Sequence, residues 1–189
     1  MMTAKKLNFG NIMGHVTNVT NLSSLASWTA DQFDPTLTWE DIAWIKDRWK
    51  GKLILKGIMD SEDAMLAVKA GADAIIISNH GGRQLDGAPS TISVLPEIVD
   101  AVNSKVEVHF DGGVRSGQDV LKALALGADC IHIGRPYVYG LGAKGQEGVE
   151  IAIEIIKKEL DLTMAMCGET NISNVGLHNL HHNPFKIIN

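Results

Sequence analysis

Residues 74–86 read Ala-Ile-Ile-Ile-Ser-Asn-His-Gly-Gly-Arg-Gln-Leu-Asp, and this stretch decides the fold. The apolar run at its start has the length and β-branching of a fully buried strand. Gly81 and Gly82 then let the backbone turn sharply and approach a ligand closely. His80 can carry a proton near neutral pH, and Arg83 can bind a carboxylate through two parallel N–H bonds. The stretch favours chemistry at the carbon next to a carboxylate. The alternative is a glycine-rich connection with no site role.

A short apolar strand followed by a helix appears four times along the chain. Strands that alternate with helices of this length indicate βα units and a parallel sheet. A repeated Gly-Ala-Asp, at residues 71–73 and 127–129, precedes two of the strands and supports a repeated unit. The pattern predicts strands over 53–57, 74–78, 106–110 and 130–133, and helices over 39–50, 61–70, 90–103, 116–126 and 148–160.

A polar or glycine-rich cluster follows each predicted strand, at residues 56–57, 78–83, 111–115 and 134–135. Because barrel and doubly wound enzymes build their sites at the C-terminal ends of parallel strands, one ligand-binding rim explains all four clusters. The glycines and arginines of the last two clusters predict a phosphate site, and Asp111 is expected to bind sugar or ribityl hydroxyls. Lys56 either extends to solvent or faces negative charge, such as a cofactor that becomes anionic on reduction.

Length and composition narrow the class of protein. The 189 residues suffice for one domain with a core, but a closed (β/α)₈ barrel typically needs roughly 250. The net charge of −5 gives no support for nucleic-acid binding. Cys130 and Cys167 lack a metal-binding spacing, which favours a reduced cytoplasmic setting. No signal peptide or apolar run of about 20 residues is found, so peripheral attachment to the inner face of a membrane is the alternative left open.

No metal site is predicted from the histidines. His109 and His132 alternate with apolar residues within strands, so packing or a hydrogen bond in the barrel interior is expected. The tail histidines 178, 181 and 182 receive no role beyond adventitious metal binding. Residues 1–37 keep no period and are expected to form an irregular loop or extension, with an active-site lid or a membrane-touching patch as the alternative. Residues 171–189 are expected to form a C-terminal tail.

The four clusters, in this order, closely resemble the C-terminal half of FMN-dependent α-hydroxy-acid dehydrogenases and oxidases. That family includes L-lactate dehydrogenase, glycolate oxidase and lactate oxidase. The likeness covers residues 38–170, and Ser-Asn-His-Gly-Gly-Arg-Gln-Leu-Asp at 78–86 is its most specific motif. Residues 28–44 resemble the bacterial L-lactate dehydrogenase branch. The family implies an α/β fold in which 38–170 form about four βα units, half of a TIM (β/α)₈ barrel, with FMN across the C-terminal mouth.

The resemblance also implies a role for each site residue. His80 would take the α-hydroxyl proton of a small (S)-2-hydroxy acid, with L-lactate as the first candidate, and Arg83 would bind its carboxylate. Lys56 would face the N1/O2 edge of the flavin, and Ser78 would also contact the ring. The residues implied for the ribityl chain and phosphate are Asp111, Gly112, Gly113, Val114, Arg115, Gly134 and Arg135. Electrons would pass on to a quinone, a cytochrome or O₂.

The resembled family is twice as long as this chain. Its first half carries the residues that cover the flavin, the tyrosines that contact substrate and the aspartate that pairs with the catalytic histidine. Half a barrel also has two open sheet edges and an exposed apolar interior. We therefore expect a fragment, or one of two pieces that need each other, either in a homo-oligomer or with an N-terminal half, and little activity alone.

Two other interpretations remain at this point. One is a non-catalytic half-barrel that self-associates and binds a phosphate-bearing ligand. The other is a different FMN or sugar-phosphate barrel enzyme, which would leave the motif at residues 78–86 unexplained.

Overall fold

The computed structural model describes residues 12, 15–17 and 19–181, in two compact units that span 1–41 and 42–189. Helix α1 (Leu22–Asp31) lies in the first unit. It begins at Asn21, whose side chain accepts a hydrogen bond from the Ser24 N–H, while Ser24 Oγ accepts one from the Asn21 N–H. The extension expected to be irregular therefore contains a regular helix. Residues 1–11 of that extension and 182–189 of the tail lie outside the described residues.

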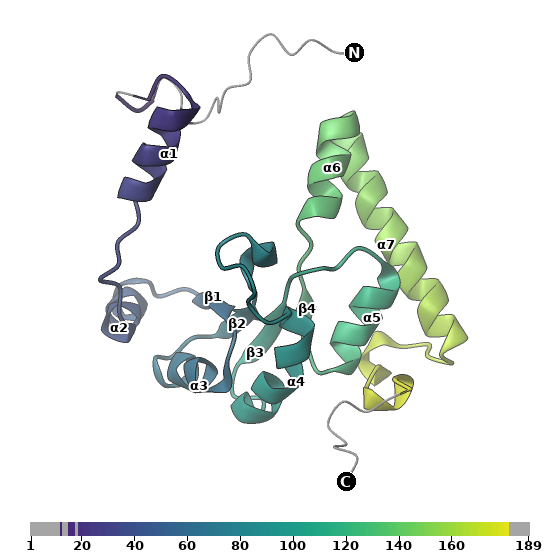
Figure 1. Cartoon of the computed structure of the whole chain (residues 1–189). Coiled ribbons are helices and arrows are strands. Elements are labelled where there is room, and N and C mark those ends of the chain that lie inside the picture. Colours follow the sequence, from purple (N-terminus) through teal and green to yellow (C-terminus); the bar gives the residue numbers. More distant parts are fainter. Residues whose placement is uncertain (1–11, 13–14, 18, 182–189) are drawn as a thin grey trace. The chain divides into compact units, whose positions relative to one another are not determined.

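The second unit is built on one parallel sheet with the strand order β1-β2-β3-β4 (Figure 1). The strands are β1 (Ile54–Ile58), β2 (Ala74–Ile77), β3 (Glu107–Phe110) and β4 (Cys130–Ile131). Parallel neighbours need a crossover connection, and α3 (Ser61–Lys69), α4 (Thr91–Val102) and α5 (Gly117–Ala125) supply the three crossovers. Helix α2 (Trp39–Arg48) precedes the sheet, and the first of its residues belong to the first unit. The predicted βα units and parallel α/β sheet are confirmed.

The end of the chain differs most from the prediction. Strand β4 has two residues, and the chain continues into two helices, α6 (Arg135–Lys144) and α7 (Gln146–Met166), of which only part of α7 was predicted. Helices α6 and α7 lie side by side because Gly140 and Gly148 allow close approach: a Cβ on Gly140 would lie 2.2 Å from the Gly148 carbonyl oxygen. Two 3₁₀ turns follow, Ile172–Asn174 and Leu177–Asn179. No helix of the described residues has the length and apolar character needed to cross a membrane.

A fixed register aligns the side chains of the four strands. Lys56 of β1 lies opposite Ile76 of β2, Ile76 opposite His109 of β3, and His109 opposite Cys130 of β4. Because successive side chains of a strand point to opposite faces, these four residues share one face of the sheet.

The other face of the sheet forms the core with the helices. Its side chains are at most 2% exposed at Ile75, Ile77, Val108 and Phe110. The opposite face carries Lys56 and His109. No helix of the described βα units packs on it, and we call it the open face. The interior expected to be apolar carries side chains of both kinds. Ile54, Ala74 and Ile76 lie on the open face, together with Lys56, Ser78, Glu107, His109, Asp111, Cys130 and His132.

The repeated Gly-Ala-Asp has a structural role at the start of two strands. Asp73 precedes β2; its N–H donates to the Leu53 carbonyl (2.8 Å), and its carboxylate accepts from the Leu53 N–H (2.9 Å). Asp129 precedes β4 and makes the same pair of bonds with Val108, at 2.8 and 2.7 Å. Each aspartate thus fixes the alignment of its strand with the one before it.

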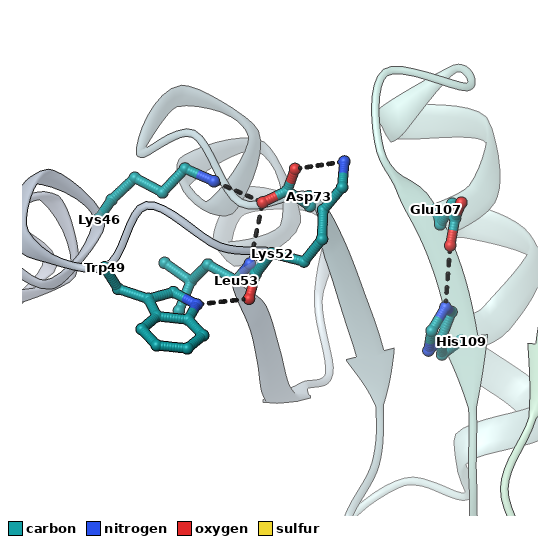
Figure 2. Close-up of polar contacts among 7 residues, drawn as sticks. All are labelled: Lys46, Trp49, Lys52, Leu53, Asp73, Glu107 and His109. Atoms are coloured by element: carbon teal, nitrogen blue, oxygen red, sulfur yellow. Dashed lines mark hydrogen bonds and ion pairs between the residues drawn. The ribbon is translucent and has the colours of Figure 1, made fainter.

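Asp73 is also an ion-pair centre (Figure 2). Lys46 of α2 and Lys52 both pair with its carboxylate, the latter at 2.9 Å. The hydrogen bond from Lys46, with those from the Leu53 N–H and Lys52, holds the pKa of Asp73 well below its usual range. The carboxylate therefore connects α2, the start of β1 and the start of β2.

We expect Asp73→Asn to lower the urea midpoint of unfolding at neutral pH, because both ion pairs are lost. The pKa of Asp73 in the folded chain lies below the unfolded value of about 3.9. The ion pairs of Asp73 therefore stabilise the fold fully above pH ~4, and this stabilisation disappears as the pH falls through the folded pKa. The difference between variant and parent should narrow in acid. Asp47→Asn is the control, since the Asp47 side chain is 86% exposed and its one ion pair within the described part of the chain is with Lys50. Equal effects of the two substitutions at pH 7 would contradict this role.

Candidate functional site

A cavity of about 740 Å³ opens at the C-terminal ends of the strands. All the residues predicted for the site line it except Ser78, which lies directly behind its wall. The lining residues are Lys56, His80, Gly81, Arg83, Asp111, Gly112, Gly113, Val114, Arg115, His132, Ile133, Gly134, Arg135, Pro136, Tyr137 and Val138. The clusters that follow the four strands thus line one cavity.

Ser78 is the centre of a polar network that joins three strands. Its side chain is 3% exposed, and Oγ donates to Asp111 Oδ1 at 2.6 Å and accepts from Lys56 Nζ at 2.6 Å. Lys56 Nζ also pairs with Asp111 Oδ2 at 3.0 Å. Because each residue stands at or near the end of a different strand, the network fixes one ammonium and one carboxylate at the cavity floor.

The loop after β2 holds His80 in an uncommon backbone conformation. His80, Gly81 and Gly82 have φ values of 55°, 68° and 71°, all left-handed, in a 3₁₀ turn at His80–Gly82. A non-glycine residue held there costs on the order of 1–3 kcal/mol, and such strain gathers at functional sites. The His80 N–H donates to Ser78 Oγ at 3.2 Å, and Arg135 Nη2 donates to the Gly81 carbonyl at 3.3 Å. The loop that carries His80 is therefore held by one bond within its own cluster and by one from the cluster that follows β4.

Glycines after β3 and β4 leave backbone exposed to the cavity. Gly112 and Gly113 have φ values of 107° and 77°, which favour glycine. A Cβ on Gly112 would lie 2.5 Å from Thr91 Oγ1, whereas a Cβ on Gly113 or Gly134 would meet nothing within 4 Å. Gly134 also caps the N-terminus of α6, which begins at the cavity wall. A helix N-terminus and open glycine backbone beside arginines are suited to bind an anion.

His132 was not predicted as a site residue, although it lines the cavity. Its ring nitrogen Nε2 lies 3.1 Å from Nδ1 of His109, which confirms the expected hydrogen bond in the interior. Burial lowers the pKa of His132, and neighbouring His109 lowers it further. Its place two residues after Cys130, on the same strand face as the other site residues, is the signal that could have identified it. Tyr137 and Val138 were missed because α6 was not recognised.

Charge in the cavity wall is mixed but mostly positive. Lys56, Arg83, Arg115 and Arg135 stand against the single carboxylate of Asp111. Arginine forks bind carboxylates and phosphates in two-point contacts, and a histidine beside them can move a proton. The site can therefore hold a phosphorylated ligand and a small carboxylate together.

Comparison with known proteins gives the family. The family model described as FMN-dependent dehydrogenase matches residues 2–182. The 2-hydroxyacid oxidase 1 of Mus musculus is 49% identical over 165 residues, which cover 87% of this chain and 45% of the relative. An L-lactate dehydrogenase of Vibrio cholerae is 43% identical over 179 residues, 95% of this chain and 47% of the relative.

Solved structures of similar proteins point to the same family. A monotopic membrane (S)-mandelate dehydrogenase superposes with a TM-score of 0.81 at 38% identity, over 89% of this chain and 44% of that one. A mandelate oxidase bound to (S)-4-hydroxymandelic acid gives 0.77 at 45% identity, over 82% and 43%. The chain spans about half the length of the curated relatives it matches. On this match, the chain belongs to the family of FMN-dependent dehydrogenases.

Proposed function

We propose that this chain supplies the cofactor-phosphate site, the proton acceptor and the carboxylate-binding arginine of an enzyme that oxidises (S)-2-hydroxy acids with FMN. The observation that carries the proposal is the single cavity that joins His80 and Arg83 to the Lys56–Ser78–Asp111 network and the glycine turns. Relatives named for lactate, 2-hydroxy acids and mandelate support this substrate class. L-Lactate is the substrate we favour, and pyruvate is its product.

The residues present fit FMN. The cavity volume falls within the range of about 300–1,000 Å³ found for cofactor sites. Open backbone at Gly113 and Gly134, with Arg115 and Arg135 beside it, would hold the phosphate. Asp111 would bind ribityl hydroxyls, and the predicted contacts of Gly112 and Val114 would complete that site. When bound, FMN supplies a two-electron acceptor for the α-carbon of the substrate.

The side chains of this chain would do the remaining work. Arg83 would bind the substrate carboxylate and so orient the α-carbon, and His80 would accept the proton of the α-hydroxyl. Lys56 would place a fixed positive charge where negative charge develops on reduction, and its pairing with Ser78 and Asp111 holds it there in advance. The electrons would then leave to a quinone, a cytochrome or O₂.

We propose that activity needs four further βα units. Strands β1 and β4 each pair on one side only within the described sheet, so both edges are open. The missing units would come from an N-terminal half or from a second copy of this chain. The alternative function is that of a non-catalytic half-barrel that self-associates and binds a phosphate-bearing ligand. The glycine and arginine clusters alone would be sufficient for such binding.

Size-exclusion chromatography with light scattering, with flavin absorbance recorded on the same peak, distinguishes these functions. We expect the 20.4 kDa chain alone to bind FMN weakly, and to bind FMN and turn over L-lactate once a first half-barrel from a relative is supplied. A stable symmetric dimer that binds phosphate, with no flavin reduction by lactate, would support the alternative. A monomeric, cooperatively folded and active chain would contradict the need for further units.

In the completed enzyme, His80→Gln should slow flavin reduction by about 10²–10⁴-fold, the usual contribution of a general base, while FMN stays bound. Stopped-flow bleaching of the flavin by lactate measures this rate. His178→Gln serves as the matched control, because His178 contacts Glu169 and is not among the residues that line the cavity. Near-normal reduction in the His80 variant would remove it from the mechanism.

Substitutions at two neighbouring glycines distinguish an effect on cofactor binding from an effect on folding. An alanine at either Gly112 or Gly113 would have to adopt a positive φ, which lowers the stability of the fold by about 1–2 kcal/mol in each case. Only at Gly112 does the new Cβ meet Thr91, so Gly112→Ala should lose more stability in urea. Gly113→Ala should instead weaken FMN binding about 10-fold or more, equivalent to about 1.4 kcal/mol, in a fluorescence titration. Unchanged FMN affinity in Gly113→Ala would show that this turn does not hold the phosphate.

A further inference from the structure

Two histidines and a cysteine meet on the open face of the sheet, at the edge of the cofactor cavity. The pairing of β3 with β4 places His109 opposite Cys130, and His132 follows two residues later on the same face. One ligand atom from each side chain lies within 4.8 Å of those of the other two. Imidazole nitrogen and thiolate sulfur suit Zn²⁺, whereas Mg²⁺ and Ca²⁺ prefer oxygen. We propose that His109, Cys130 and His132 bind a zinc ion beside the FMN cavity, which His132 also lines.

The facing ring nitrogens have nearly the spacing of two zinc ligands. His109 Nδ1 and His132 Nε2 lie 3.1 Å apart, with the ring planes tilted by 38°. Nitrogens bound at about 2.0–2.1 Å to a tetrahedral zinc ion are about 3.3–3.4 Å apart, so small ring rotations provide the space. Without metal, the same contact is a hydrogen bond between two imidazoles, and one proton lies where the ion would bind.

A carboxylate already orients the buried histidine. Glu107 Oε2 lies 3.3 Å from His109 Nε2 (Figure 2), whereas His132 contacts the other ring nitrogen, Nδ1. A proton on Nε2, directed to Glu107, leaves the lone pair of Nδ1 facing His132 and Cys130. Metal-binding histidines commonly donate their other ring N–H to a carboxylate in this way. Since His109 is only 8% exposed, the ring has little freedom to turn away.

Zinc binding here is a proton exchange with no redox step. The Cys130 thiol loses its proton to water as its sulfur bonds to the ion, and a proton on His132 Nε2 moves through solvent to Nδ1. The thiolate and the Glu107 carboxylate offset the charge of the ion. The three side chains leave a fourth position, which a water molecule can fill.

The position of the site gives it a role in the fold. Strand β4 has two residues, and β3 pairs with it only through His109–Cys130 and Phe110–Ile131. An ion bound by one ligand from β3 and two from the β4 segment would join the shortest strand of the sheet to its neighbour. Zinc should therefore raise the thermal midpoint of unfolding, because it binds the folded chain.

Cobalt titration of the metal-free full chain, without FMN, tests the site independently of the proposed enzyme activity. We expect Co²⁺ to give the visible bands of a tetrahedral ion and a near-ultraviolet band from thiolate-to-cobalt charge transfer, and Zn²⁺ to bleach both. The charge-transfer band should disappear in Cys130→Ser and persist in Cys167→Ser, whose sulfur is exposed and elsewhere in the chain. Circular dichroism of each variant, and Cys130→Ala as a second substitution, identify any loss of folding.

Two further variants separate this site from adventitious binding by the tail. Glu107→Ala should weaken zinc binding by about 10–100-fold, as expected when the carboxylate behind a histidine ligand is removed. The double substitution His178→Ala and His181→Ala should leave both the affinity and the charge-transfer band unchanged. A band that survives Cys130→Ser, binding that depends on the tail histidines, or no cobalt band at millimolar Co²⁺ would each overturn the proposal.

Discussion

The parallel register of the four strands is the constraint on which the site depends. It aligns Lys56 with His109 and Cys130 on one face, and therefore also places Ser78, Asp111 and His132 there. Because side chains alternate, a slip of one residue would turn this set toward the helices and expose the apolar core. Asp73 and Asp129 oppose such a slip, since each binds both backbone groups of one residue in the preceding strand segment. The chemistry of the cavity is thus secured by hydrogen bonds at the other end of the strands.

Much of this arrangement could be predicted from the sequence for physical reasons. A parallel strand buried on both faces appears as a short apolar run, as at 74–77, and the turn after it demands glycine. Strand ends in a parallel sheet meet at one edge, so the sequence places residues far apart along the chain, such as Lys56 and Asp111, on one ligand-binding rim, and the two side chains form an ion pair. Their individual contacts with FMN and substrate remain proposals.

What the sequence did not reveal depends on contacts between distant segments. Helix α6 has glycines that ordinarily argue against a helix, yet Gly140 permits the close approach to Gly148 that pairs α6 with α7. Helix α1 depends on the reciprocal cap of Asn21 and Ser24, a weak signal in a polar stretch. The meeting of His109, Cys130 and His132 follows only from the exact pairing of β3 with β4, because neither cysteine has a recognisable ligand spacing.

The charged side chains of the open face would affect how a complete barrel assembles. The apolar face of the sheet is already covered by its own helices. On the open face, the side chains of Lys56 and Glu107 are 45% and 71% exposed, so water reaches these charges without exposing the core. Docking of a second half would then remove water from the Lys56–Asp111 ion pair and from the Glu107 carboxylate, which costs free energy. Association would be governed by how well the incoming residues and the cofactor replace that hydration. A bound anionic ligand that contacts both halves would supply part of that replacement.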